Sequence, residues 1–117
     1  MKVYSFEKLN LWQESRKYVV EIYKLTNCFP REEIFGLRSQ IRRTAVSVTS
    51  NIGEGKGEIS GLEKARHTKI AYSSLLETFS QLINASDLGY ISKDDVLNLG
   101  PKVDHVGNML SALRKRQ

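Results

Sequence analysis

Residues 60–89 read SGLEKARHTKIAYSSLLETFSQLINASDLG, and this stretch decides the fold class. Ser60 followed by Glu63 is a capping box, which marks a helix start because each side chain accepts a hydrogen bond from a free backbone N–H. Gly89 stands where such a helix would end. The spacing between them predicts a helix to about Leu88 with a wide, deeply buried apolar arc. The arc holds Ala65, Ala71, Tyr72, Leu75, Leu76, Phe79, Leu82 and Ile83.

Residues 5–27 predict an earlier helix that carries two apolar faces, with Ser5 as its N-cap. One face holds Leu9, Trp12, Val19, Val20, Tyr23 and Thr26, and the other holds Leu11, Tyr18, Ile22 and Leu25. A helix with two apolar faces has two packing partners. We expect one partner within the same bundle and one in another subunit.

Two more helices are predicted, over residues 30–55 and 92–114. The first begins near Pro30 to Glu33 and ends at the glycines of residues 53–57. Its core positions are Ile34, Leu37, Ile41, Ala45, Val48 and Ile52. The second begins after Ser92, with Val96, Leu99, Val103, Val106, Leu110 and Leu113 as core positions. Gly100-Pro101 predicts a kink or short break within it, because proline lacks a backbone donor and clashes with the preceding turn.

The whole chain of 117 residues predicts a single domain over residues 1–117. Without alternating strand patterns, four helices joined by short connections favour an all-α, up-down-up-down antiparallel four-helix bundle. The sequence contains no run of about 18 apolar residues, so it predicts no membrane-spanning helix. The first residues become charged too soon to resemble a signal peptide. Cys28 is the single cysteine, which excludes an intrachain disulfide. We expect a cytoplasmic protein.

The motifs that would hold a cofactor, a metal or a nucleophile are incomplete. Residues 53–57, GEGKG, fail the phosphate-loop pattern because position 50 is serine, and they fail the dinucleotide pattern because position 58 is glutamate. His67 and His105 have no His or Cys at metal-ligand spacing. Cys28 has no positioned histidine and is interpreted as structural. The sequence predicts no cofactor, no metal and no catalytic residue, and therefore a protein that is not an enzyme.

A stripe of polar residues runs along one face of the second predicted helix. We expect it to face polar positions on the third predicted helix. We interpret it as a structural Arg–carboxylate network that sets the register of helix or subunit packing. Its members are Arg43, Ser47, Asn51, Glu54, Ser74 and Glu77. The alternative is an acid/base site formed by Arg43, Glu54 and Glu77, which would need a cleft open to solvent.

The chain carries 18 Lys and Arg against 13 Asp and Glu, a net charge of +5. Its pI near 9.4 is typical of nucleic-acid binders, although a basic surface can also serve solubility alone. The excess is spread evenly over the two halves of the sequence, +3 in residues 1–58 and +2 in residues 59–117. The predicted phosphate contacts are Arg38, Arg42, Lys56, Arg66, Lys69, Arg114, Lys115 and Arg116.

Five motifs resemble the four-helix-bundle family of proteins encoded by intervening sequences in bacterial 23S ribosomal RNA genes. They are Phe6-x-x-Leu9-x-x-Trp12, Phe29-Pro30-x-x-Glu33, Gly36-Leu37-x-x-Gln40-x-x-Arg43-x-Ala45-x-Ser47, Ser50-Asn51-Ile52-x-Glu54-Gly55 and Ser74-Leu75-Leu76-Glu77. Together they cover nearly the whole chain. Gly53 and Ser73 depart from the Ala and Gly usual in the family, and Gly100-Pro101 is unusual.

The resemblance implies a compact bundle that assembles into a homo-oligomeric, pentameric ring. A related accessory protein of diversity-generating retroelements binds nucleic acid and a reverse transcriptase, so the resemblance also implies nucleic-acid binding. We therefore expect a non-enzymatic oligomer that binds RNA or structured nucleic acid through phosphate contacts, without sequence readout. The alternative is a ring-shaped protein-interaction module that does not touch nucleic acid, which acidic interruptions of the basic face would favour.

Overall fold

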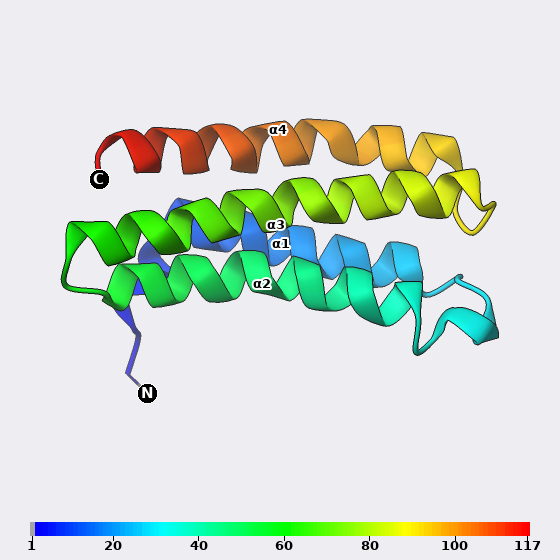
Figure 1. Ribbon diagram of the computed structural model, residues 1–117, viewed down its shortest axis with the longest axis horizontal. Coiled ribbons are helices and arrows are strands. Elements are labelled where there is room, and N and C mark those ends of the chain that lie inside the picture. The colour runs from blue at the N-terminus through cyan, green and yellow to red at the C-terminus, as the bar shows by residue number, and fades with distance from the viewer. Residues whose placement is uncertain (1) are drawn as a thin grey trace.

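The computed structural model describes residues 2–117, and its chain is folded into four long helices. They are α1 (Asn10–Thr26), α2 (Leu37–Gly57), α3 (Gly61–Asp87) and α4 (Lys93–Lys115). Two short 3-10 helices, η1 (Ser5–Lys8) and η2 (Arg31–Glu33), precede α1 and α2. Consecutive helices run antiparallel and pack side by side, so both termini lie at one end (Figure 1). This confirms the predicted all-α, up-down-up-down bundle.

The core is mostly aliphatic, and its buried aromatic side chains are Tyr18 and Phe29. Ile22, Ile41, Leu75 and Leu110 contribute one side chain from each of the four helices, all fully buried. Removing such a side chain from water contributes about 1.5–3 kcal/mol. The Tyr18 hydroxyl donates a hydrogen bond to Thr78 Oγ1 at 2.9 Å, and burial raises the pKa of Tyr18 to about 12.

The predicted helix caps of α3 and α4 are confirmed. Ser60 Oγ accepts a hydrogen bond from the backbone N–H of Glu63 at 3.1 Å, and Ser92 Oγ accepts one from Asp95 at 3.0 Å. Gly89 has a φ of +83°, which an L side chain rarely adopts. This left-handed residue reverses the chain after α3, as the sequence predicts for a C-terminal glycine.

The first two helices begin later than predicted. Residues 5–8 form a 3-10 helix, and extended backbone at Leu9 separates it from α1. This bend brings the ring of Phe6 against Trp12, with centroids 5.0 Å apart. In the second case α2 begins at Leu37, whose backbone N–H donates to Glu33 Oε1 at 2.9 Å. Ile34 is therefore 36% exposed rather than part of the core, and its predicted core position is wrong.

Glycines 53 and 55 lie inside α2, which ends at Gly57, the last glycine of the predicted segment and two residues beyond the predicted boundary at Gly55. Gly55 allows close packing, because a Cβ atom there would lie 2.9 Å from Cβ of His67 on α3. A Cβ atom on Gly53 would make ordinary van der Waals contact with the Phe6 ring, at 3.6 Å. The predicted break at Pro101 is absent, because α4 continues through it. Pro101 and Leu97 are both exposed, so water can hydrate the Leu97 carbonyl that the proline leaves without a donor.

Candidate nucleic-acid interface

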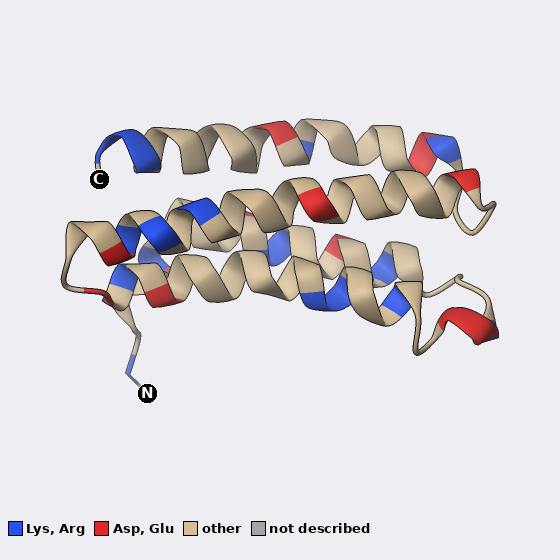
Figure 2. Ribbon diagram, in the orientation of Figure 1, with Lys and Arg blue, Asp and Glu red and all other residues tan. Residues whose placement is uncertain are grey.

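The fold concentrates positive charge at the end of the bundle that holds both termini, which we call the terminal end. It comprises residues 2–10, 50–69 and 109–117. Nine of the 18 Lys and Arg but only four of the 13 Asp and Glu lie there, so the remaining residues carry nine of each and are neutral. The whole net charge of +5 therefore falls at the terminal end (Figure 2). Its cations are Lys2, Lys8, Lys56, Lys64, Arg66, Lys69, Arg114, Lys115 and Arg116.

Carboxylates neutralise few of these cations. Glu54 and Glu58 flank His67 instead, with oxygens 3.7 Å from its Nδ1 and 3.4 Å from its Nε2. Within residues 2–117, Arg66 is the one cation of the terminal end with a carboxylate within 4 Å, at 3.9 Å from Glu63. The other cations of the terminal end have no carboxylate partner in this part of the chain.

Six of the eight predicted phosphate contacts lie together at the terminal end. These are Lys56, Arg66, Lys69, Arg114, Lys115 and Arg116. Lys64 lies at the same end of the bundle, but the sequence did not predict it as a phosphate contact, because it does not belong to a run of basic residues. Its Nζ donates to the carbonyl oxygens of Lys56 at 3.3 Å and Gly55 at 3.5 Å, which stabilises the C-terminus of α2.

Arg38 and Arg42 lie toward the opposite end of the bundle, in the first half of α2. The guanidinium of Arg42 is largely occupied. Its Nε donates to Thr26 Oγ1 at 2.9 Å, and its Nη2 donates at 3.0 Å to both the Tyr23 carbonyl and Asn27 Oδ1. Burial and the nearby charge of Arg38 lower the pKa of Arg42. Arg42 thus joins α2 to the last turn of α1.

Part of the predicted polar network forms between α2 and α3. Ser47 Oγ and Ser74 Oγ lie 3.0 Å apart, and Asn51 Nδ2 donates to the Ser47 carbonyl at 2.8 Å. Asn51 Oδ1 lies 3.0 Å from His67 Nδ1. His67 is a member that sequence reasoning missed, because only the pairing of the two helices places it opposite Asn51.

The carboxylates of the predicted network have other partners than Arg43. Glu77 accepts a hydrogen bond from Thr44 Oγ1 at 3.1 Å, while Glu54 lies beside His67. Arg43 is exposed, and no carboxylate among residues 2–117 lies within 4 Å of its guanidinium. The structure therefore does not bring the arginine into the network. Arg43 lies one turn before Ser47 on α2, but its side chain is exposed to solvent.

The described residues contain neither a metal cluster nor a membrane-spanning helix. No three His, Cys, Asp or Glu side chains in residues 2–117 are grouped so that they could hold a metal ion. None of the helices in this part of the chain has the length and apolar character needed to cross a bilayer.

Four antiparallel helices with one strongly basic end define a small basic helical bundle. Residues 7–112 match the family described as 23S rRNA-intervening sequence protein, and the chain belongs to this family. It is similar to the crystal structure of a protein of unknown function from the S23 ribosomal protein family of Bacteroides thetaiotaomicron. The two are 22% identical with a TM-score of 0.81, over 90% of this chain and 95% of that one. At this identity the likeness shows the fold alone. No curated protein matches the chain.

Proposed function

We propose that the protein is a non-enzymatic homo-oligomer that binds RNA or structured nucleic acid through phosphate contacts at the terminal end. The observation that supports this proposal most is the concentration of the net charge of +5 at that end. Lys and Arg side chains that contact phosphates release condensed counterions, which drives association without reading the base sequence. Because eight of the nine cations have no carboxylate partner within residues 2–117, the phosphates meet no internal competitor.

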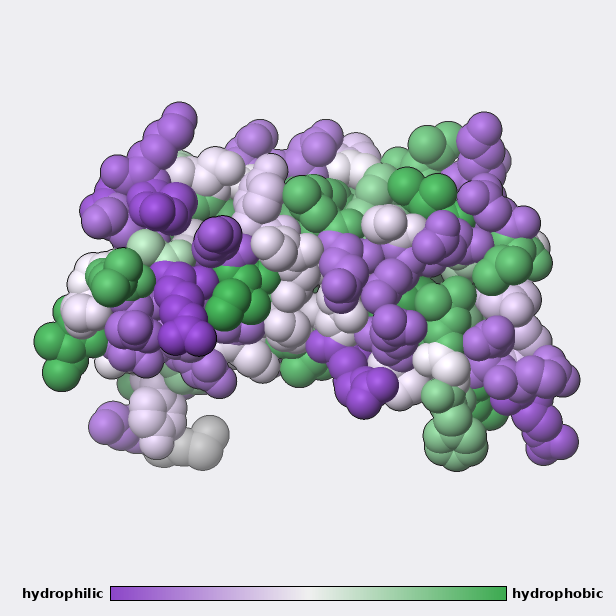
Figure 3. Space-filling model, in the orientation of Figure 1, coloured by the Kyte–Doolittle hydropathy of each residue, from purple (hydrophilic) through white to green (hydrophobic). Residues whose placement is uncertain are grey.

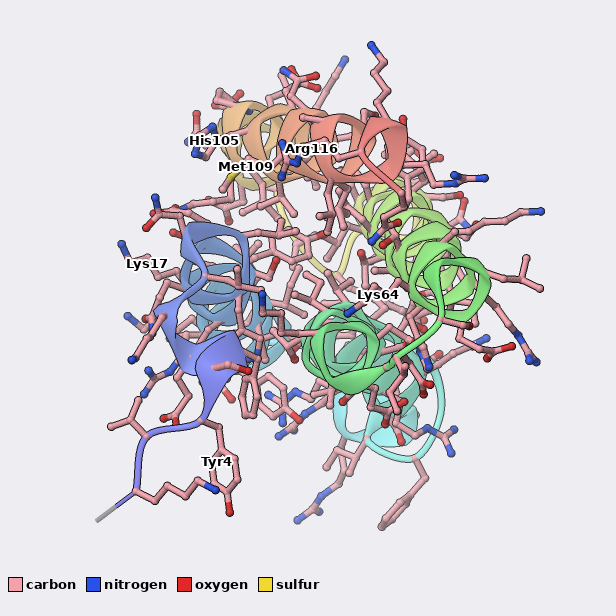
Figure 4. All side chains as sticks on the ribbon, turned by 90° about the vertical axis from the view of Figure 1, so that its left-hand side faces the viewer. Tyr4, Lys17, Lys64, His105, Met109 and Arg116 are labelled. Atoms are coloured by element: carbon pink, nitrogen blue, oxygen red, sulfur yellow. The ribbon has the colours of Figure 1, made fainter. Side chains whose placement is uncertain are left out.

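Two exposed apolar surfaces support the oligomeric part of the proposal. The α1/α2 face exposes Val20, Tyr23 and Val46, and the α3/α4 face exposes Tyr72, Leu76, Ile83 and Leu97. On the α3/α4 face, Tyr72, Leu76 and Ile83 are exposed although the sequence predicts them on a deeply buried arc. Figure 3 shows apolar patches along α3 and its border with α4. Seen end-on, the helices follow one another around the core, so the two faces lie on opposite sides (Figure 4).

Opposite and unlike faces favour a head-to-tail contact between subunits. Such a contact generates a ring when the rotation between neighbours closes, and the family resemblance implies a ring of five. Subunits arranged side by side and parallel would bring all their terminal ends to one rim. A rim of this kind multiplies the field of a single subunit and makes individually weak phosphate contacts add.

The proposal is tested by titrating salt into complexes of the protein with a structured RNA hairpin, followed by fluorescence anisotropy. We expect the affinity to fall steeply with salt. Replacing Lys56, Lys69 and Arg114 together with alanine should reduce the slope of log affinity against log salt by about 0.7–0.9 for each phosphate that the variant no longer neutralises. All three side chains are exposed, so the fold should survive the change.

The matched control removes exposed cations from the neutral part of the molecule. Lys24→Ala combined with Arg31→Ala and Lys93→Ala removes three positive charges, as the terminal-end variant does, but leaves the terminal end intact. Equal reductions of affinity in the control and in the terminal-end variant would show non-specific attraction. If the folded oligomer fails to bind RNA at about 50 mM salt, the nucleic-acid proposal is wrong and the protein-interaction module takes its place.

A further inference from the structure

A cavity of about 570 Å³ opens at the terminal end, between the ends of all four helices. Its size is typical of small-molecule sites. The inner wall is aliphatic and includes Leu11, Ile52 and Leu113 from three different helices. Met109, which also lines the cavity, has a flexible side chain that adapts to the shape of an apolar ligand. Figure 4 looks onto this end and labels Lys64 on α3 together with Met109 and Arg116 at the end of α4.

The rim of the cavity is positively charged. Lys56, Lys64 and Arg116 line it, and no acidic residue does. None of these three cations has a carboxylate within 4 Å in the described part of the chain. Positive charge at the mouth and aliphatic side chains inside give the cavity a clear polarity, from a cationic entrance to an apolar interior.

Two of the neutral polar side chains that line the cavity, Asn51 and Thr68, are already hydrogen-bonded within the protein, whereas those of Asn10 and Gln117 are exposed. Asn51 bonds to Ser47 and His67, and the Thr68 hydroxyl donates to the Lys64 carbonyl at 3.0 Å. The aliphatic inner wall therefore offers no free hydrogen-bonding group to a sugar or a nucleobase, which would lose water there without replacement. A ligand that fits this arrangement has an apolar body and one anionic group.

We propose that this cavity binds a monocarboxylate with an unbranched aliphatic chain, of the fatty-acid type. The carboxylate lies among Lys56, Lys64 and Arg116, and the chain lies against Leu11, Ile52 and Leu113. This site stands independently of RNA binding, because its apolar interior has no role in phosphate contacts. Since Lys56 and Arg116 belong to both surfaces, carboxylate and RNA compete for the terminal end if both bind.

The probes are decanoate, decanol and decyltrimethylammonium, which share a chain length and differ in the charge of the head group. Each is titrated calorimetrically into the full-length protein below its micellar concentration. We expect decanoate to bind at least about 10-fold more tightly than decanol, because the alcohol cannot form charge-assisted hydrogen bonds with the rim. The ammonium compound should not bind. Equal affinity of decanoate and decanol would overturn the proposal.

Variants locate the site. Ala112 is exposed and lines the cavity, so Ala112→Phe should fill the mouth and abolish decanoate binding. Arg116→Ala should weaken binding several-fold, whereas Lys115→Ala, one residue away and outside the lining, should leave it unchanged. Circular dichroism checks that each variant is folded. Undiminished binding in both Ala112→Phe and Arg116→Ala, or equal weakening in Lys115→Ala, would place decanoate elsewhere. A wild-type protein that binds no decanoate would also refute the proposal.

Discussion

Arg42 on α2 lies over the ring of Tyr23 on α1, 4.4 Å from the ring centroid, and donates a hydrogen bond to the Tyr23 carbonyl oxygen. One side chain therefore satisfies a carbonyl at the C-terminal end of α1 and covers the aromatic ring of the same residue. Cations stabilise the C-terminal end of a helix, where the carbonyl groups carry partial negative charge. This relationship gives Arg42 a structural function within the subunit.

Replacing Arg42 with alanine should lower the free energy of unfolding by about 2 kcal/mol, since the change removes hydrogen bonds to a charged group together with a cation–π interaction. Urea unfolding followed by circular dichroism measures the change. Arg38→Ala, four residues earlier on the same helix, is the control and should cost less than about 0.5 kcal/mol. A reduced salt slope for RNA in folded Arg42→Ala would instead assign Arg42 to the nucleic-acid surface.

Gly55 sets the distance between α2 and α3. A methyl group there would lie 2.9 Å from Cβ of His67, closer than real Cβ atoms approach their neighbours. Gly55→Ala should therefore destabilise the protein by about 1–3 kcal/mol, despite the better helix propensity of alanine. Gly57→Ala is the matched control, because nothing lies within 4 Å of a Cβ at that position. Thermal unfolding of both variants measures the difference, and equal melting temperatures would refute the packing role of Gly55.

The buried Tyr18 predicts a decrease in stability at alkaline pH. Its pKa is raised from 10.0 to about 12 in the folded protein, so the unfolded chain loses this proton first as the pH rises. The stabilising contribution is complete below pH 10 and is lost as the pH rises through 12. In that window the free energy of unfolding should fall by about 1.4 kcal/mol per pH unit from this group.

Tyr18→Phe removes this ionisation and should flatten the alkaline decline, while lowering stability near neutral pH by about 1 kcal/mol because the bond to Thr78 is absent. Urea unfolding between pH 8 and pH 12 measures both effects. Tyr4→Phe is the control, because it removes a phenol hydroxyl from a side chain that is exposed rather than buried. An alkaline decline as steep in Tyr18→Phe as in the wild type would contradict the assignment.

The two apolar faces predict a specific pattern of assembly. Val46→Asp on the α1/α2 face or Leu76→Asp on the α3/α4 face should each reduce the particle to a monomer of 13.3 kDa. Each variant keeps one intact face. Mixing the two should therefore restore a single head-to-tail contact and yield a dimer, which light scattering detects.

Ile59→Asp is the control for assembly. Ile59 lies between α2 and α3 and is 97% exposed, so adding a charge there should leave the mass unchanged. Dissociation by only one of the two face variants would indicate a symmetric contact between like faces. No change in either variant would show that subunits meet elsewhere.

Local signals account for the parts of the fold that were predicted correctly. Ser60 and Ser92 cap helices because a serine oxygen within reach of the third backbone N–H is a local arrangement. The errors come from contacts between segments. Gly55 resembles a helix end in the sequence, but it lies within α2, at a point where the close approach of His67 from α3 leaves no room for a Cβ atom. Ile34 fits the helical spacing, but the 3-10 turn before Leu37 moves it to the surface.

The sequence by itself determined the four helices, their order and the family, because caps, helical periodicity and contiguous motifs act over a few residues. Only the tertiary structure decided where the charge acts. The two halves of the sequence are almost equally basic, yet antiparallel packing brings residues 2–10, 50–69 and 109–117 to one end and leaves the rest neutral. The tertiary structure also engages Arg42 in hydrogen bonds with α1, and it places Lys56 and Arg116 at the mouth of a cavity. Electrostatic and apolar interactions depend on how close residues lie in the folded protein, and the spacing of residues along the chain does not specify that distance.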